Sequence, residues 1–147
     1  MIRVVFDTNV FVSAILTPKS PPAELLELIL EGKLRLIISP QIIEEIERVF
    51  GYPKIKKLIK KRELTPSEIE DAFLKIAKVA VVTPGELSVE AVPDDPSDNM
   101  VLACALEGHA NFIISGDRHL TNLKTYRGIE IVSPARSLKF LKELEIS

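Results

Sequence analysis

The sequence has little that would support a disulfide-bonded or membrane-spanning protein. Its 147 residues include one cysteine, no tryptophan and only 5% aromatic residues. The single Cys104 excludes an intrachain disulfide, which fits a reducing compartment, and its apolar neighbours indicate a packing role. No apolar segment approaches the roughly 20 residues that a membrane helix needs. We therefore expect a cytoplasmic protein that makes no membrane contact.

Aliphatic segments dominate what is present. Hydrophobic residues make up 46% of the chain, enough to build a core for one domain spanning residues 1–147. Short apolar runs alternate with amphipathic helical patterns, which predicts a three-layer α/β/α sandwich around a mostly parallel sheet of four to five strands. The expected strands are residues 2–6, 34–38, 79–82, 111–115 and 129–132. The expected helices are residues 21–31, 40–50, 55–62, one beginning at residue 65, 95–107 and 134–144.

Acidic residues stand where these elements begin or end. Asp7 follows the first strand, Asp117 follows the strand at residues 111–115, and Asp98 opens a strongly apolar helix. Ligands of parallel sheets bind beyond the carboxyl ends of the strands, so these acids should meet at one edge. Only oxygen ligands are on offer, which suits Mg²⁺ or Mn²⁺ better than zinc.

A fourth acid should come from the helix at residues 40–50. At about 100° per residue, Glu45 and Glu47 border its apolar stripe while Glu44 points to solvent. Glu45 is nearer the start of the helix, hence nearer the sheet edge, but both remain candidates at this point.

Each acid also has a purely structural explanation. Asp7 and Asp95 are good helix caps, and Asp117 could be a turn residue paired with Arg118. A non-enzymatic interaction module with these acids as caps is therefore the alternative hypothesis. Other Asp-dependent or nucleotide-binding folds fit less well. The first turn has no glycine for a dinucleotide, and Asn9 stands where a phosphoaspartate phosphatase would carry its second aspartate.

Four segments taken in order resemble the PIN domain, a family of metal-dependent ribonucleases that includes the VapC-type toxins. They are residues 4–10 (VVFDTNV), 39–46 (SPQIIEEI), 95–99 (DPSDN) and 113–117 (IISGD). The resemblance covers nearly the whole chain and places the family's four acids, as catalytic residues and metal ligands, on Asp7, Glu45, Asp98 and Asp117. It also implies supporting roles for Thr8, Asn9, Ser115 and one or both of Asp94 and Asp95.

The resemblance further implies Mg²⁺- or Mn²⁺-dependent cleavage of RNA, a homodimer or higher homo-oligomer, and, in toxins, an antitoxin partner. The net charge of −2 means that attraction to RNA must come from a local patch or from the metal. A solvated helix face is the default explanation for the basic run at residues 54–62. In a metal-site protein it becomes the best candidate for RNA contact, through Lys54, Lys56, Lys57, Lys60 and Lys61, together with Arg118. We leave His119 out of the catalytic set because a metal makes a histidine base unnecessary.

Overall fold

The fold is organised around one six-stranded sheet. A computed structural model describes residues 1–92 and 95–146. The strands stand in the order β3-β2-β1-β4-β6-β5, and all are parallel except β5, which runs antiparallel to β6. The predicted α/β class and mostly parallel sheet are confirmed, although the sheet has six strands instead of four to five. The strands are β1 (Arg3–Phe6), β2 (Arg35–Ile38), β3 (Val81–Val82), β4 (Phe112–Ile114), β5 (Thr125–Tyr126) and β6 (Ile129–Val132).

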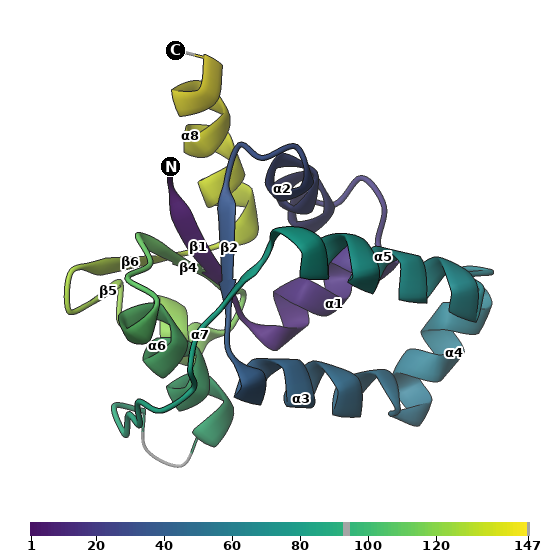
Figure 1. Ribbon diagram of the computed structural model, residues 1–147, viewed down its shortest axis with the longest axis horizontal. Helices are drawn as coiled ribbons and strands as arrows, with labels where there is room; N and C mark the ends of the chain where they lie inside the picture. Colours follow the sequence, from purple (N-terminus) through teal and green to yellow (C-terminus); the bar gives the residue numbers. More distant parts are fainter. Residues whose placement is uncertain (93–94, 147) are drawn as a thin grey trace.

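Helices pack on both faces of this sheet, as predicted. In Figure 1, α1, α2 and α8 lie on one side of the strands and α6 on the other, where α6 packs on β1, β2 and β4. Three further helices form an arm, α3–α5, that extends away from the sheet. The helices are α1 (Thr8–Leu16), α2 (Pro21–Leu30), α3 (Pro40–Phe50), α4 (Pro53–Lys61), α5 (Pro66–Val79), α6 (Pro96–Glu107), α7 (Arg118–Thr121) and α8 (Pro134–Ile146).

The central strands carry continuous apolar sequence because they are covered on both faces. Val4 and Val5 of β1 and Ile113 of β4 have no exposed surface. The register pairs Val4 with Phe112 and Phe6 with Ile114, so β1 and β4 end side by side. Asp7 and Ser115, the residues that follow these two strands, therefore lie together at the carboxyl edge of the sheet.

Two helices were not predicted, and the reason is local in each case. α1 is apolar on most of its surface, with Val10, Phe11 and Val12 all buried, so its sequence has no amphipathic period. α7 has only four residues, and it begins at Asp117, whose side chain caps it. His119 therefore lies on this short helix.

The strand predictions need two corrections: one strand begins later than expected, and one strand was not predicted. Val79 belongs to α5, because the backbone N–H of Ala80 still bonds to Ile76, and this leaves only Val81 and Val82 in β3. β5 was missed because it has two residues. It joins β6 through Arg127 and Gly128, both at positive φ, as in the tight turns that suit hairpins.

Side-chain anchors fix the orientation of α6. The Arg3 guanidinium on β1 donates two hydrogen bonds, of 3.0 and 2.8 Å, to the carbonyl of Gly108 at the C-terminal end of α6. At the other end, Asn99 makes paired hydrogen bonds with the backbone of Val92. The N-terminus of α6, which carries Asp98, is thereby held over the carboxyl edge of the sheet. Across residues 1–92 and 95–146, no helix is both long and apolar enough to cross a membrane.

Candidate metal centre

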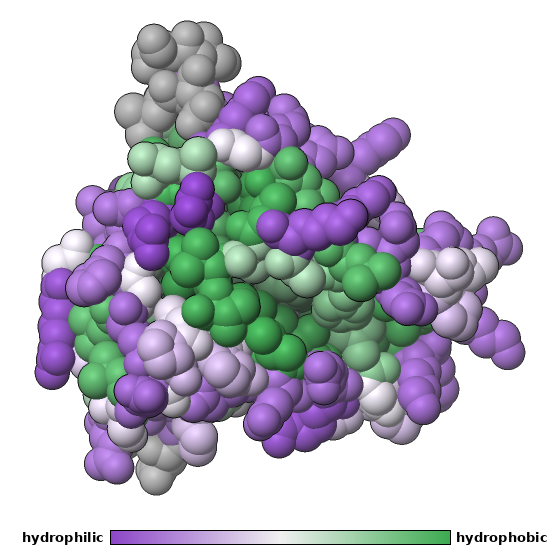
Figure 2. All heavy atoms as spheres, in the orientation of Figure 1, coloured by the Kyte–Doolittle hydropathy of each residue, from purple (hydrophilic) through white to green (hydrophobic). Residues whose placement is uncertain are grey.

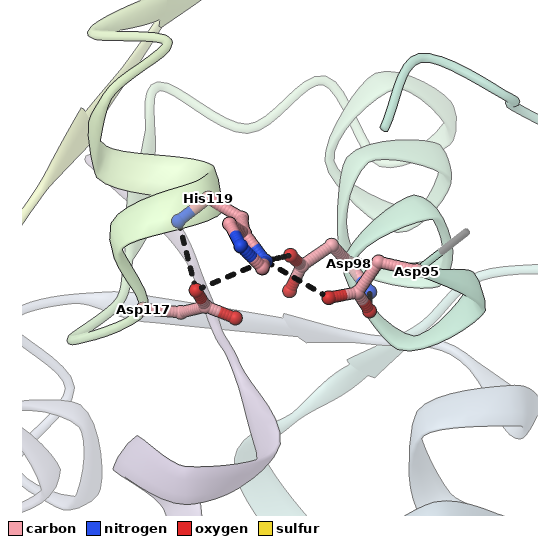
Figure 3. A group of neighbouring side chains, drawn as sticks. All are labelled: Asp95, Asp98, Asp117 and His119. Carbon is pink, nitrogen blue, oxygen red and sulfur yellow. Dashed lines mark hydrogen bonds and ion pairs between the residues drawn. The ribbon is translucent and has the colours of Figure 1, made fainter. Parts of the chain in front are cut away.

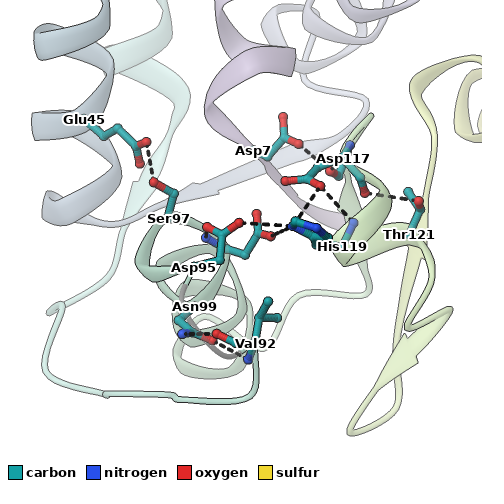
Figure 4. A network of polar contacts seen from close by, with 11 residues as sticks. Asp7, Glu45, Val92, Asp95, Ser97, Asn99, Asp117, His119 and Thr121 are labelled. Carbon is teal, nitrogen blue, oxygen red and sulfur yellow. Dashed lines mark hydrogen bonds and ion pairs between the residues drawn. The ribbon is translucent and has the colours of Figure 1, made fainter.

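One polar pocket at this sheet edge collects all four predicted acids. Its volume is about 270 Å³. Asp7 comes from the end of β1, Glu45 from α3, Asp98 from α6, and Asp117 from the segment after β4. Figure 4 shows Asp7 and Asp117 close together with Glu45 across from them beside Ser97, and Figure 3 shows Asp98 near Asp117. The chain positions of these residues span more than a hundred residues, so only the fold brings them together.

Three aspartates at this edge cap helices, as expected for Asp7 and Asp95, whereas Asp117 caps α7 instead of forming the turn expected for it. Asp7 accepts a hydrogen bond from the N–H of Val10 at 2.8 Å, Asp95 from that of Asp98 at 3.1 Å, and Asp117 from that of His119 at 2.8 Å. The caps belong to α1, α6 and α7, and these helices therefore begin at the same place. Because a helix N-terminus favours negative charge, this arrangement partly offsets the repulsion among the crowded carboxylates. The side chains that cap the three helices are therefore the same ones that meet in the pocket.

Ser115 links two of these aspartates. Its hydroxyl, which has no exposed surface, donates to Oδ2 of Asp7 and accepts from the backbone N–H of Asp117 at 2.9 Å. Both carboxylate oxygens of Asp7 are therefore hydrogen-bonded within the protein. Burial raises the pKa of Asp7, an effect that the hydrogen bonds from Ser115 and Val10 oppose and the charge of Asp117 reinforces.

Asp98 is a buried carboxylate of the pocket with a raised pKa. It is 4% exposed, and its Oδ2 has no hydrogen-bond partner among the described residues. Burial, followed by its interactions with Asp95 and Asp117, raises its pKa to about 8. By contrast, the hydrogen bond from the backbone of Asp98 lowers the pKa of Asp95. A buried carboxylate oxygen with no partner is costly unless a cation neutralises it.

Four side chains form a close group at this edge, and the three aspartates among them line the pocket. One ligand atom from each of Asp95, Asp98, Asp117 and His119 lies within 4.8 Å of the others, so the group could hold a metal ion (Figure 3). The oxygen-rich donor set and the unpartnered Asp98 oxygen both fit a hard divalent cation. Asp7 and Glu45 line the same pocket outside this group.

The structure also distinguishes between the two glutamates left open by the sequence. Glu45 is half-buried, and its Oε1 accepts a 2.8 Å hydrogen bond from the hydroxyl of Ser97 on α6. Its Oε2 is buried without a hydrogen-bond partner among the residues described. Glu47 is exposed and lines a different, apolar groove, and Glu44 is exposed as expected. Glu45 is therefore the glutamate that α3 directs to the pocket.

Two contacts of the pocket were not anticipated. Ser97 positions the Glu45 carboxylate, and the imidazole of His119 faces the aspartates. Ser97 lies in the first turn of α6 beside Asp98, and His119 lies two residues after Asp117. Their nearness to predicted site residues in the chain was the available signal, but it does not say which way a side chain points.

The remaining predicted residues are distributed as follows. Thr8 and Asn9 line the pocket, and the buried Thr8 hydroxyl has no hydrogen-bond partner within the described part of the chain. Asp94 lies outside the described residues. Arg118 is exposed at the start of α7. The five lysines of α4 are all exposed, but Figure 1 shows α4 at the outer end of the arm, away from α6 and α7. These are Lys54, Lys56, Lys57, Lys60 and Lys61.

Comparison with known proteins identifies the family. A family model described as "PIN domain" matches residues 3–119. The chain belongs to the PIN domain family. This PIN domain is 34% identical over 127 residues to a protein of Methanocaldococcus jannaschii named "Uncharacterized protein MJ1680", covering 84% of this chain and 76% of that protein.

A solved structure shares the fold of this PIN domain. It is the crystal structure of VapBC2 from Rickettsia felis bound to a DNA fragment from their promoter. The TM-score is 0.55 and the sequence identity 15%, with 88% of this chain and 97% of that chain covered. At this identity the match shows the common fold alone, and the matched family model carries the family assignment.

Proposed function

We propose that this PIN domain is a ribonuclease that uses Mg²⁺ or Mn²⁺ to cleave RNA phosphodiester bonds. The observation that carries the proposal is the buried Oδ2 of Asp98, which has no hydrogen-bond partner among the described residues and lies where three capped helix N-termini meet. Membership of the PIN family supports it, since PIN domains are generally nucleases. We assign Asp7, Glu45, Asp98 and Asp117 as the catalytic, metal-holding set.

The side chains of this set have different tasks in the proposal. A divalent ion, when bound, would lower the pKa of a water molecule and screen the charge of the attacked phosphate. Asp98 and Asp117 belong to the group of side chains that could hold the ion. Asp7 is hydrogen-bonded to Ser115 and so fixes the backbone that carries Asp117. Glu45 forms the opposite wall, held there by Ser97.

The direct test is cleavage of a single-stranded RNA by the pure protein. We expect cleavage with Mg²⁺ or Mn²⁺, none after chelation by EDTA, and loss of cleavage in an Asp98→Asn variant. A single-stranded DNA of the same sequence, run in parallel, measures selectivity for RNA. A protein that binds RNA but never cleaves it with either metal would instead be a non-catalytic interaction module.

The exposed lysines of α4 are the proposed contact for the RNA backbone. Replacement of Lys54, Lys57 and Lys61 by glutamate reverses three charges and should weaken RNA binding. It should also reduce the slope of log affinity against log salt by about 2, because each lost single-strand phosphate contact removes about 0.7. Binding titrations at several salt concentrations measure both quantities.

A matched control places the same charge change elsewhere. Lys33, Lys78 and Lys139 are exposed and lie outside α4, so their reversal should change the slope much less. An equal loss in both triple variants would mean that only net charge matters and would remove α4 as a contact.

Family resemblance also implies assembly, and the structure offers a surface for it. An apolar groove lies between α3 and α5, and Figure 2 shows hydrophobic surface gathered there. Val82 of the edge strand β3 lines it and is 54% exposed, and Phe50 and Phe73 also line it. Exposed apolar surface of this kind marks interaction sites. We infer that a second copy of this chain covers the groove.

Light scattering on the pure protein tests this homodimer. The wild-type chain should have the mass of a dimer, and Val82→Lys should shift it to a monomer at micromolar concentration. Leu74→Lys is the control, because Leu74 on α5 is 57% exposed but does not line the groove. A monomeric wild-type chain would rule out the second copy and leave the groove to a different partner, such as the antitoxin of a toxin pair.

A further inference from the structure

We infer that the imidazole of His119 is a nitrogen ligand of the metal centre and sets its preference among divalent ions. The inference rests on the proposed function, since it concerns the same pocket. It gives a ligand role to His119, which the sequence alone did not place in the catalytic set. It also names metal preference as the property that His119 controls.

The first support is the position of the ring. Nδ1 of His119 lies 3.4 Å from Oδ2 of Asp95, 3.8 Å from Oδ1 of Asp117 and 3.9 Å from Oδ2 of Asp98 (Figure 3). Two atoms that each bind the same ion at about 2.1 Å lie at most about 4.2 Å apart. All three distances are within this limit, so Nδ1 is close enough to share an ion with each of the carboxylates.

The second support is how the ring is held there. The carboxylate of Asp117 caps α7 by accepting the backbone N–H of His119. The same side chain that lies in the pocket thus fixes the backbone from which the imidazole projects. The ring is 70% exposed, so packing does not force it toward the aspartates. Its Nδ1 nevertheless faces the three carboxylates.

The third support is the buried carboxylate oxygen of Asp98. Oδ2 of Asp98 is buried, has no hydrogen-bond partner among the described residues, and lies 3.9 Å from Nδ1. At this separation no hydrogen bond joins the two atoms. An ion between them would satisfy both, whereas an ion pair between His119 and Asp95 alone leaves the Asp98 oxygen without a partner.

The chemical consequence concerns metal choice. Carboxylates alone suit Mg²⁺, Ca²⁺ and Mn²⁺, whereas an imidazole nitrogen favours transition metals. A centre in which one histidine nitrogen joins the carboxylates should therefore bind Mn²⁺ and Co²⁺ more tightly than Mg²⁺. Without the imidazole, that margin should shrink.

Pulsed EPR of bound Mn²⁺ gives a direct readout, because a nitrogen ligand adds a hyperfine coupling from its ¹⁴N nucleus. We expect this coupling in the wild-type protein and its loss in His119→Gln. The control is His109→Asn. His109 is the only other histidine. It follows α6 at positive φ, a conformation that Asn tolerates, and it comes 11 residues after Asp98, which is about 16 Å along a helix.

Calorimetry measures the selectivity of the centre between Co²⁺ and Mg²⁺. His119→Gln should weaken Co²⁺ binding about tenfold and Mg²⁺ binding by less than about threefold. Bound Mn²⁺ without ¹⁴N coupling, or equal weakening of both metals, would overturn the inference while leaving metal-dependent cleavage intact. If the wild-type protein binds Mn²⁺ with the coupling but does not cleave RNA, the proposed function fails and the histidine ligand stands.

Discussion

Asp98→Asn should reduce metal-dependent RNA cleavage by about 10²–10³-fold and at the same time stabilise the metal-free protein. Asparagine keeps the shape of the side chain and the backbone N–H that Asp95 accepts. It removes the charge of a carboxylate that burial, Asp95 and Asp117 all disfavour. A residue that matters only for folding would show the opposite pattern, with lower stability and little specific loss of activity.

The readouts are initial cleavage rates and melting temperatures with and without Mg²⁺. In the wild-type protein, the added metal should raise the melting temperature, because an ion that binds only the folded state stabilises it. In the variant this increase should be small. Asp71→Asn is the control, since Asp71 is an exposed residue of α5 whose partner is Lys75. Wild-type cleavage by Asp98→Asn would refute the assignment of this residue.

The metal-free protein should lose stability as the pH rises from about 4 to about 8. Asp98 has a pKa of about 8 when folded, against about 3.9 in an unfolded chain. Between these values the folded state holds a proton that the unfolded state has released, so stability falls as the pH increases. Asp7, whose pKa is also raised, acts in the same direction. The expected loss is on the order of 2–4 kcal/mol, or roughly 5–12 °C in melting temperature.

Two controls separate this effect from general acid or base sensitivity. Asp98→Asn should flatten most of the slope and leave the part that comes from Asp7. Asp95, whose pKa is lowered, contributes stability that is lost only as the pH falls below about 4, outside this window. Saturating Mg²⁺ should oppose the slope, because the ion binds the deprotonated carboxylates. A metal-free melting temperature that stays constant from pH 5 to 8 would contradict the raised pKa of Asp98.

Much of the fold follows from local sequence. The capping box of Thr65 and Glu68 marks the start of α5, and both of its hydrogen bonds are present in the structure. Apolar runs such as residues 34–38 mark strands that are buried on both faces. The local pattern did not predict α1, because its apolar surface has no period. It also did not predict β5, which forms only because β6 lies beside it.

The candidate site also has features that follow from local sequence and features that depend on the tertiary structure. The sequence by itself determined which residues carry the carboxylates and that Asp7 and Asp117 follow strands, because strand ends and helix caps are local features. Only the tertiary structure decided that Glu45, and not Glu47, lies in the pocket, because Ser97 of another helix holds it there. Only the tertiary structure placed His119 against three aspartates. The physical reason is that the direction of a polar side chain depends on charges and hydrogen-bond partners contributed by distant segments, which periodicity does not encode.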